Sequence, residues 1–211
     1  MLPIRFAFAI GLILLGLCTP TWAQSLMVEA TISDSTHIDV GLGEIIEIEI
    51  FADLSGYAAA GISLYVRLPA SPFSIVDQGG HAKEGVRPWL PGSLFAGAME
   101  TENCLVTGRE AGLSHNQQLL AYSLILGPGK NRSRSGKGVV GRFQFMSMEP
   151  IDNARIEVFS NPVHDSFLVL GDGLTERRFR GVQDLEVSAF RTTLVHTRDS
   201  WGAIKTRYTA D

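Results

Sequence analysis

The sequence contains very little cysteine, which limits how the fold can be held together. Among its 211 residues only Cys18 and Cys104 are cysteines, and Cys18 lies in an N-terminal segment that we expect to be removed. One remaining thiol cannot form an internal disulfide, even at an oxidising destination. Cys104 stands in an apolar run with Leu105 and Val106, so we predict a buried and unreactive side chain in a strand.

The sequence also lacks the residue patterns of common catalytic and metal sites. Its five histidines are widely separated, and none has the spacing of an H-x-H or HExxH ligand set. His164, Asp165 and Ser166 are the residue types of a hydrolytic triad, but a triad is assembled across a fold, so we interpret them as a turn after Pro162. These absences predict a protein that is not an enzyme and needs no cofactor. The alternative, a hydrolase of unrecognised type, requires a cleft with clustered carboxylates.

Positive charge is too sparse and too scattered for a nucleic-acid surface. The chain has 18 Lys and Arg residues against 22 Asp and Glu residues, a formal net charge of −4. Binding to nucleic-acid phosphates requires cations gathered on one face. The densest basic stretch, residues 130–137, also contains glycine and serine, and we interpret it as a solvated hairpin loop. We therefore expect no nucleic-acid partner.

A long apolar run occurs only at the N-terminus. Arg5 precedes an unbroken apolar and glycine run over residues 6–17, Pro20 ends it, and Ala23 supplies a small residue at the expected cleavage point. This order is typical of a secretory signal, here residues 1–23. The run is shorter than the ~20 residues of a permanent membrane helix. We predict export to the periplasm or the cell exterior, with no stable membrane span in the mature chain.

Two other fates of this leader are alternatives to cleavage. The first is an uncleaved anchor. The second is a lipoprotein acylated at Cys18, although Leu17 is larger than the small residue that usually precedes such a cysteine. In the preferred interpretation, removal of the leader leaves a chain long enough for one hydrophobic core but short for two domains.

Residues 24–190 show short apolar strands separated by Gly, Pro, Asn and Asp, and no amphipathic helix interrupts them. The clearest alternation is in residues 44–51, where Ile46, Ile48 and Ile50 share one face and two glutamates the other. Further strands are expected at residues 26–32, 60–68, 73–76, 103–106, 119–126, 138–146, 154–159, 167–170, 174–179 and 185–190. Asp172, between two glycines, predicts a tight hairpin and gives only a weak calcium signal. We predict an all-β protein, a single β-sandwich with jelly-roll topology and about nine strands.

A long irregular stretch, residues 77–98, contains Trp89 and Phe95. Loops of this length in compact domains are often functional. The two rings either present an aromatic platform to a sugar or a partner, or they plug the open end of the sandwich; the sequence leaves both possibilities open. A carbohydrate-binding surface would need exposed aromatic rings in a row, for which Tyr57 and Tyr65 are the other candidates.

Several segments occur in the order found in a known group of modules. In chain order they are Gly41-Leu42-Gly43-Glu44, Gly61 to Val66, the bend Pro88 to Gly92, Leu120 to Ser123, residues 136–145 with the pattern G-x-G-x-x-x-x-F-x-F, and Ala154 to Val158. This order resembles the bacterial cohesin-like modules, which are relatives of the carbohydrate-binding-module sandwiches. The resemblance covers most of residues 26–190.

The resemblance implies a nine-stranded jelly-roll sandwich that binds a partner on one sheet face. In cellulosomal cohesins the partner is a calcium-loaded dockerin. This chain departs from that setting, since it has one such module and no dockerin-like duplicated Asp/Asn loop. We therefore predict a secreted, non-catalytic, cohesin-like module for protein–protein interaction, with a dockerin-like partner. The alternative is a carbohydrate-binding module that recognises a polysaccharide.

The last segment, residues 191–211, differs from the strands before it. Trp201, Ile204 and Tyr208 would share one side of a short helix that Ser200 caps. An isolated helix of this length is marginal in water. We predict a short helical tail that either packs back on the sandwich or serves in docking or sorting.

Overall fold

The fold consists of strands, turns and loops. The computed structural model describes residues 25–30, 36–79, 85–129 and 132–191, and these residues form no helix, hence none long and apolar enough to cross a membrane. The strands are β1 (Ser25–Ala30), β2 (His37–Gly41), β3 (Ile45–Asp53), β4 (Ala59–Pro69), β5 (Phe73–Ile75), β6 (Trp89–Pro91), β7 (Met99–Thr107), β8 (Gln117–Ile125), β9 (Lys137–Ser147), β10 (Ile151–Val158), β11 (Phe167–Leu170), β12 (Glu176–Arg178), β13 (Gly181–Gln183) and β14 (Leu185–Phe190). The expected all-β class is confirmed. The predicted signal, residues 1–23, and the helix predicted within residues 200–208 lie outside the described residues.

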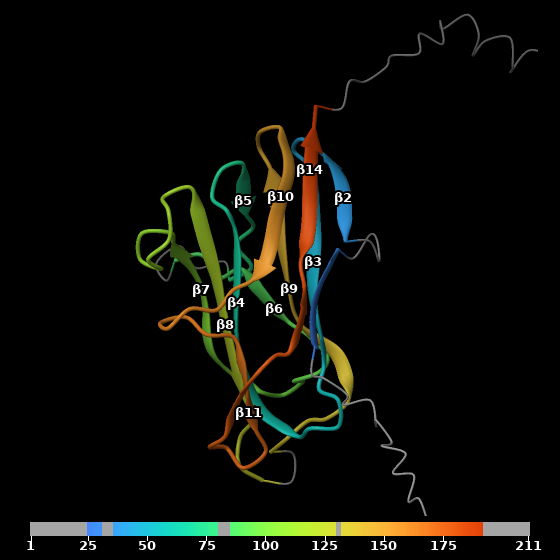
Figure 1. Cartoon of the computed structure of the whole chain (residues 1–211), viewed down its shortest axis with the longest axis vertical. Helices are drawn as coiled ribbons and strands as arrows, with labels where there is room; N and C mark the ends of the chain where they lie inside the picture. Colours follow the sequence, from blue (N-terminus) through green and yellow to red (C-terminus); the bar gives the residue numbers. More distant parts are fainter. Residues whose placement is uncertain (1–24, 31–35, 80–84, 130–131, 192–211) are drawn as a thin grey trace, which may run out of the picture.

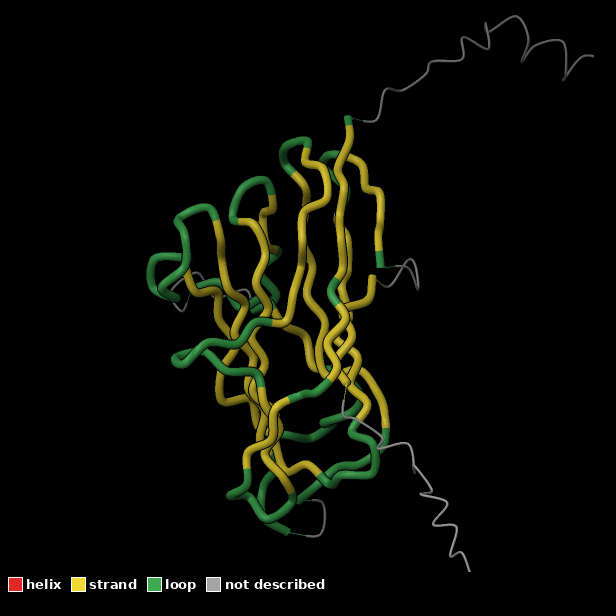
Figure 2. The backbone as a smooth tube through the Cα atoms, in the orientation of Figure 1, coloured by secondary structure: helices red, strands yellow, loops and turns green. Residues whose placement is uncertain are grey.

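Two sheets make up the sandwich (Figure 1). The first sheet has the strand order β13-β1-β3-β9-β5, and β6 also pairs with β9. The second has the order β12-β11-β4-β10-β14-β2, with β8 on β4 and β7 on β8. Figure 2 shows the strands running lengthwise and most loops gathered at the two ends. The predicted sandwich of two sheets is confirmed.

The described residues form fourteen strands, of which eleven overlap the expected segments and three, β2, β6 and β13, were not expected. Strands β5 and β6 pair with successive parts of β9, and β11 and β10 pair with successive parts of β4. In each case two strands share one edge of a longer strand. Alternation in the sequence indicates which residues of one strand share a face. It does not indicate which other strands pair with that strand, or where one partner ends and the next begins.

The core lies between the sheets, as the alternation predicts. Ile46, Ile48 and Ile50 of β3 are at most 2% exposed. Glu47 and Glu49 point to the outer face of the first sheet, where Arg142 of β9 forms an ion pair with each of them. The isoleucine row supplies much of the stability here, since burying one such side chain is worth ~1.5–3 kcal/mol.

An aromatic stack completes the core beside β9. Trp89 lies on Tyr122 of β8 with 5.1 Å between ring centroids and 13° between ring planes, and it meets Phe143 edge-on at 5.0 Å. Gly141 of β9 makes room for both larger rings. A Cβ at this position would lie 2.8 Å from Cε1 of Tyr122 and 3.1 Å from Cε3 of Trp89. The stack therefore requires glycine at position 141.

One side chain joins the two sheets at the edge next to this stack. Asn103 of β7 accepts a hydrogen bond from the N–H of Trp89 and donates one to its carbonyl oxygen, both at 3.0 Å. The same amide donates to Glu100, which forms an ion pair with Arg87. The Asn103 amide thus takes the place of a strand partner for β6, and a side chain protects this sheet edge.

Replacement of Gly141 by alanine should lower the free energy of unfolding by about 1–3 kcal/mol, because the added methyl group overpacks the two rings. Denaturant unfolding of Gly141→Ala and the wild type measures the difference. Gly127→Ala is the matched control, since an added Cβ there has no heavy atom within 4 Å. Equal stability of Gly141→Ala and the wild type would show that the rings tolerate the methyl group.

Candidate functional site

The outer face of β7, β8, β4 and β11 gathers apolar and hydroxyl side chains, among which Met99 and Ile125 are exposed; we call it the front face. These strands pair in that order, so their outward residues lie in rows across the sheet. The rows are Met99, Ile125, Gly61 and Val169; then Glu102, Ser123, Ser63 and Phe167; then Cys104, Ala121 and Tyr65. The residues between them along the strands, such as Leu124 and Ile62, point into the core.

The first row forms a flat apolar strip. The side chains of Met99 and Ile125 are 63% and 41% exposed. Gly61 lies between Ile125 and Val169, and a Cβ on it would come within 2.6 Å of the carbonyl oxygen of Leu124. A side chain is therefore excluded at Gly61, so none projects from the centre of the strip. Exposed apolar residues on adjacent strands, unlike scattered ones, indicate an interaction surface.

The second row is polar, and its groups are hydrogen-bonded to one another. Glu102 accepts a hydrogen bond from the hydroxyl of Tyr65 at 3.1 Å and from that of Ser123 at 3.0 Å. The hydroxyl oxygens of Ser123 and Ser63 are 3.2 Å apart. Burial, and then the charge of Glu102, raise the pKa of Tyr65, so its hydroxyl remains a donor at neutral pH. The carboxylate is thus satisfied within the face rather than left for a ligand.

A loop over residues 159–166 covers part of the third row; it leaves the second sheet between β10 and β11 and projects from its side (Figure 1). The hydroxyl of Ser166 accepts a hydrogen bond from the N–H of Tyr65 at 2.9 Å and donates one to the carbonyl oxygen of Phe159 at 2.8 Å. The ring of His164 meets that of Tyr65 edge-on at 5.2 Å. Ser166 is buried and holds backbone together, so its place in the structure is that of a loop anchor.

The structure separates the four aromatic residues that the sequence singles out. Trp89 and Phe95 are each 2% exposed, so their rings plug the core and do not form a surface platform. Tyr57 lies in the turn between β3 and β4, and the guanidinium of Arg177 stands 4.4 Å from its ring centroid. Tyr65 lies on the front face. These four residues therefore form no row of exposed rings.

Sequence reasoning missed Met99, Ile125 and Glu102. The predicted strand began at Asn103, whereas β7 begins at Met99, so the first two outward residues of this strand were assigned to no element. Ile125 ends a strand that is apolar at most positions, which hides its outward face. The polar side chain of Ser123 could have indicated the outward face of this strand. Ile125 is two residues further along and therefore lies on the same face.

The described residues contain no group of three or more His, Cys, Asp and Glu side chains that could hold a metal ion. Asp172, the carboxylate considered for calcium, instead organises the hairpin between β11 and β12, which confirms the predicted turn. It accepts hydrogen bonds from the N–H groups of Leu174 and Thr175 at 3.0 and 2.9 Å. The hydroxyl of Thr175, followed by these N–H groups, lowers the pKa of Asp172 to about 2.

Cys104 lies in the third row of the front face and is half-buried, not fully enclosed. Burial, and then the charges of Glu102 and Glu110, raise the pKa of its thiol. We expect iodoacetamide to alkylate Cys104 in the folded protein more slowly than a free cysteine at neutral pH, because only the thiolate reacts. Mass spectrometry measures the rate, and the urea-unfolded chain is the control. A rate equal to that of the unfolded chain would contradict this prediction.

Neither a protein-family model nor a curated protein matches the sequence, whereas solved structures do. The chain is similar to a type II cohesin domain from the cellulosome of Acetivibrio cellulolyticus, with a TM-score of 0.58 and 13% identity over 78% of this chain and 95% of that one. A type II cohesin–X–dockerin complex from the same organism gives 0.55 and 11%, over 78% and 99%. A type I cohesin–dockerin complex from Clostridium thermocellum gives 0.50 and 9%, over 80% and 99%.

These likenesses extend over nearly the full length of each cohesin, although few residues are identical. Similarity of this kind shows a shared fold, and a shared fold does not by itself show a shared ligand. It does agree with the sequence segments that resemble cohesin-like modules. The part of the chain that the structure describes thus has the cohesin fold, a jelly-roll sandwich.

Proposed function

We propose that this chain is an exported, non-catalytic module that binds a protein partner on its front face. The observation that carries the proposal is the flat strip of Met99 and Ile125 beside the hydrogen-bonded network of Glu102. An apolar centre with satisfied polar groups around it is typical of protein–protein interfaces. Export rests on the leader, residues 1–23, which lies outside the described residues.

A protein partner is favoured over a polysaccharide. Stacking on a sugar requires an exposed ring, and Trp89, the first candidate, is buried. Arg177 lies over the ring of Tyr57, and Tyr65 is bonded to Glu102. Two of the similar structures are described as cohesin–dockerin complexes. We therefore propose a dockerin-like partner, which would be calcium-loaded.

The hydrogen bonds of the front face favour binding over catalysis. The carboxylate of Glu102 accepts hydrogen bonds from two hydroxyl groups of the face, and Glu100 beside it is paired with Arg87. The hydroxyl of Ser166 is used by the backbone of β4 and of its own loop. The proposed function is therefore binding alone.

A pull-down tests the proposal, with residues 24–211 as bait against secreted and surface proteins of the protein's own source. Insoluble polysaccharides are tested in parallel. We expect saturable capture of one protein, and loss of capture in EDTA if the partner is a calcium-loaded dockerin. Retention on a polysaccharide with no captured protein would overturn the proposal and favour a carbohydrate-binding module.

The position of the binding face has its own test. Ile125→Arg places a charge in the apolar strip and should weaken binding of the captured protein at least about tenfold. Ile45→Arg is the matched control, because Ile45 is 58% exposed and starts β3 on the outer face of the other sheet. Titration calorimetry measures both variants, after circular dichroism has shown that they fold. Equal affinities of the two variants would contradict the assignment to the front face.

A further inference from the structure

Between β13 and β14 the chain passes from the first sheet to the second through a single residue, Asp184. Strand β13 pairs with β1 in the first sheet, and β14 pairs with β10 in the second. A connection of one residue leaves no flexible loop between the two strands. A change in the interactions of Asp184 therefore acts on the strands on both sides of it.

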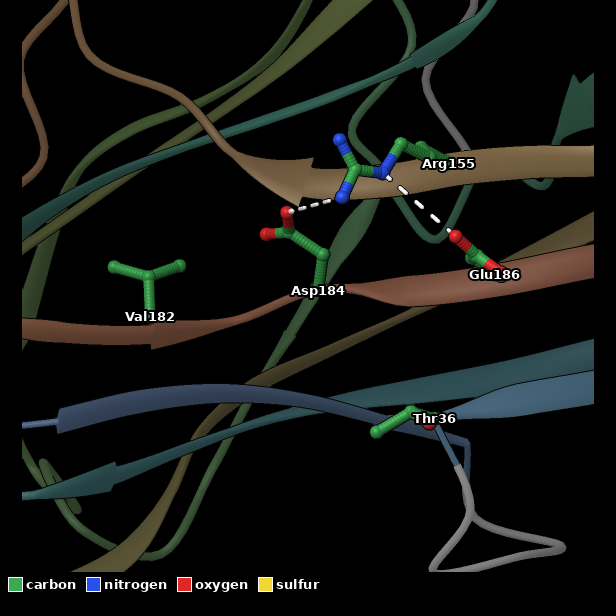
Figure 3. A pocket seen from close by; sticks show the side chains of 5 residues that line it. All are labelled: Thr36, Arg155, Val182, Asp184 and Glu186. Atoms are coloured by element: carbon green, nitrogen blue, oxygen red, sulfur yellow. Dashed lines mark ion pairs between the residues drawn. The ribbon is translucent and has the colours of Figure 1, made fainter.

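Asp184 lines a hollow of about 340 Å³, together with Thr36, Arg155, Val182 and Glu186 (Figure 3). Arg155 points between the two carboxylates, with 3.8 Å from its Nη2 to Oδ2 of Asp184 and 4.0 Å from its Nε to Oε1 of Glu186. Both distances are longer than hydrogen bonds. The side chain of Arg155 is 60% exposed and that of Asp184 is 26% exposed, so water screens this attraction.

Further charges face the crossover from the neighbouring strands. Glu157 of β10 lies on the same outward face as Arg155 and binds Arg67 of β4. On the other side, Nδ1 of His37 in β2 is 4.0 Å from Glu186. Two carboxylates, those of Asp184 and Glu186, thus line the hollow, while the third, Glu157, is paired with Arg67.

Burial, and then repulsion from Glu157, raise the pKa of Asp184, whereas Arg155, the N–H of Val158 and Arg67 act in the opposite direction. The raising effects are larger, so the folded state favours the protonated carboxyl group more than the unfolded chain does. The ionised group therefore lowers stability above the raised pKa of the folded state. This penalty disappears as the pH falls below the ordinary pKa of 3.8.

We propose that the crossover at Asp184 is a pH-sensitive joint between the two sheets, tighter when its carboxyl group is protonated and looser when it is ionised. The change is confined to β13 and β14, the two strands that Asp184 connects. The inference is independent of the partner proposed above, since it concerns only groups within this chain.

The variant Asp184→Asn tests the joint, because asparagine keeps the shape and an acceptor for the N–H of Val158 but cannot ionise. At about pH 7.5 its melting temperature should exceed that of the wild type by about 1–4 °C, and the difference should vanish near pH 4. Amide hydrogen exchange over residues 181–187 should be slower in the variant at the higher pH, with the core of β8 unchanged. A variant equally or less stable than the wild type at pH 7.5 would overturn the proposal.

Asp53→Asn is the control of opposite sign. A hydrogen bond from Lys137 is the largest cause of the lowered pKa of Asp53, so this variant should be less stable than the wild type at neutral pH. That difference should also fade as the pH falls, because the benefit of ionised Asp53 is lost in acid. Carbon-13 titration of the Asp184 carboxyl in the wild type needs no variant. A pKa at or below 3.8 would overturn the joint directly.

Discussion

Strand β4 is hydrogen-bonded along both edges, and the rest of the structure depends on this pairing. Strand β8 follows one edge from Gly61 to Pro69, while β11 and then β10 occupy the other. This register directs Ile62, Leu64 and Val66 into the core and leaves their neighbours on the front face. A shift by one residue would exchange the two sets, so the core and the candidate binding face are specified together.

The break between β10 and β11 connects this constraint to function. Two short strands share one edge of β4, and the chain between them folds over Tyr65, where the hydroxyl of Ser166 holds it to the β4 backbone. The strip of Met99 and Ile125 remains uncovered beside it. In the proposed function the partner contacts this open part of the face, and the loop forms one of its borders.

The period-two pattern predicted the parts of the fold that depend on local burial. Ile46, Ile48 and Ile50 are in the core, because alternation along a strand is set by the pleat of the backbone itself. The same reasoning could not place Trp89 or Ile125. An aromatic residue in an irregular segment can pack inward or outward, and Trp89 packs inward because Gly141 of a strand distant in sequence leaves space for it.

The sequence by itself determined the all-β class, the position of most strands, the turn at Asp172 and the resemblance to cohesin-like modules. These features follow from local alternation, turn chemistry and the order of short segments along the chain. Only the tertiary structure decided which side chains form the front face and which charges surround Asp184. Both sets join residues from several strands, and their spacing is set by strand register and by the crossover between the sheets, which no local pattern records.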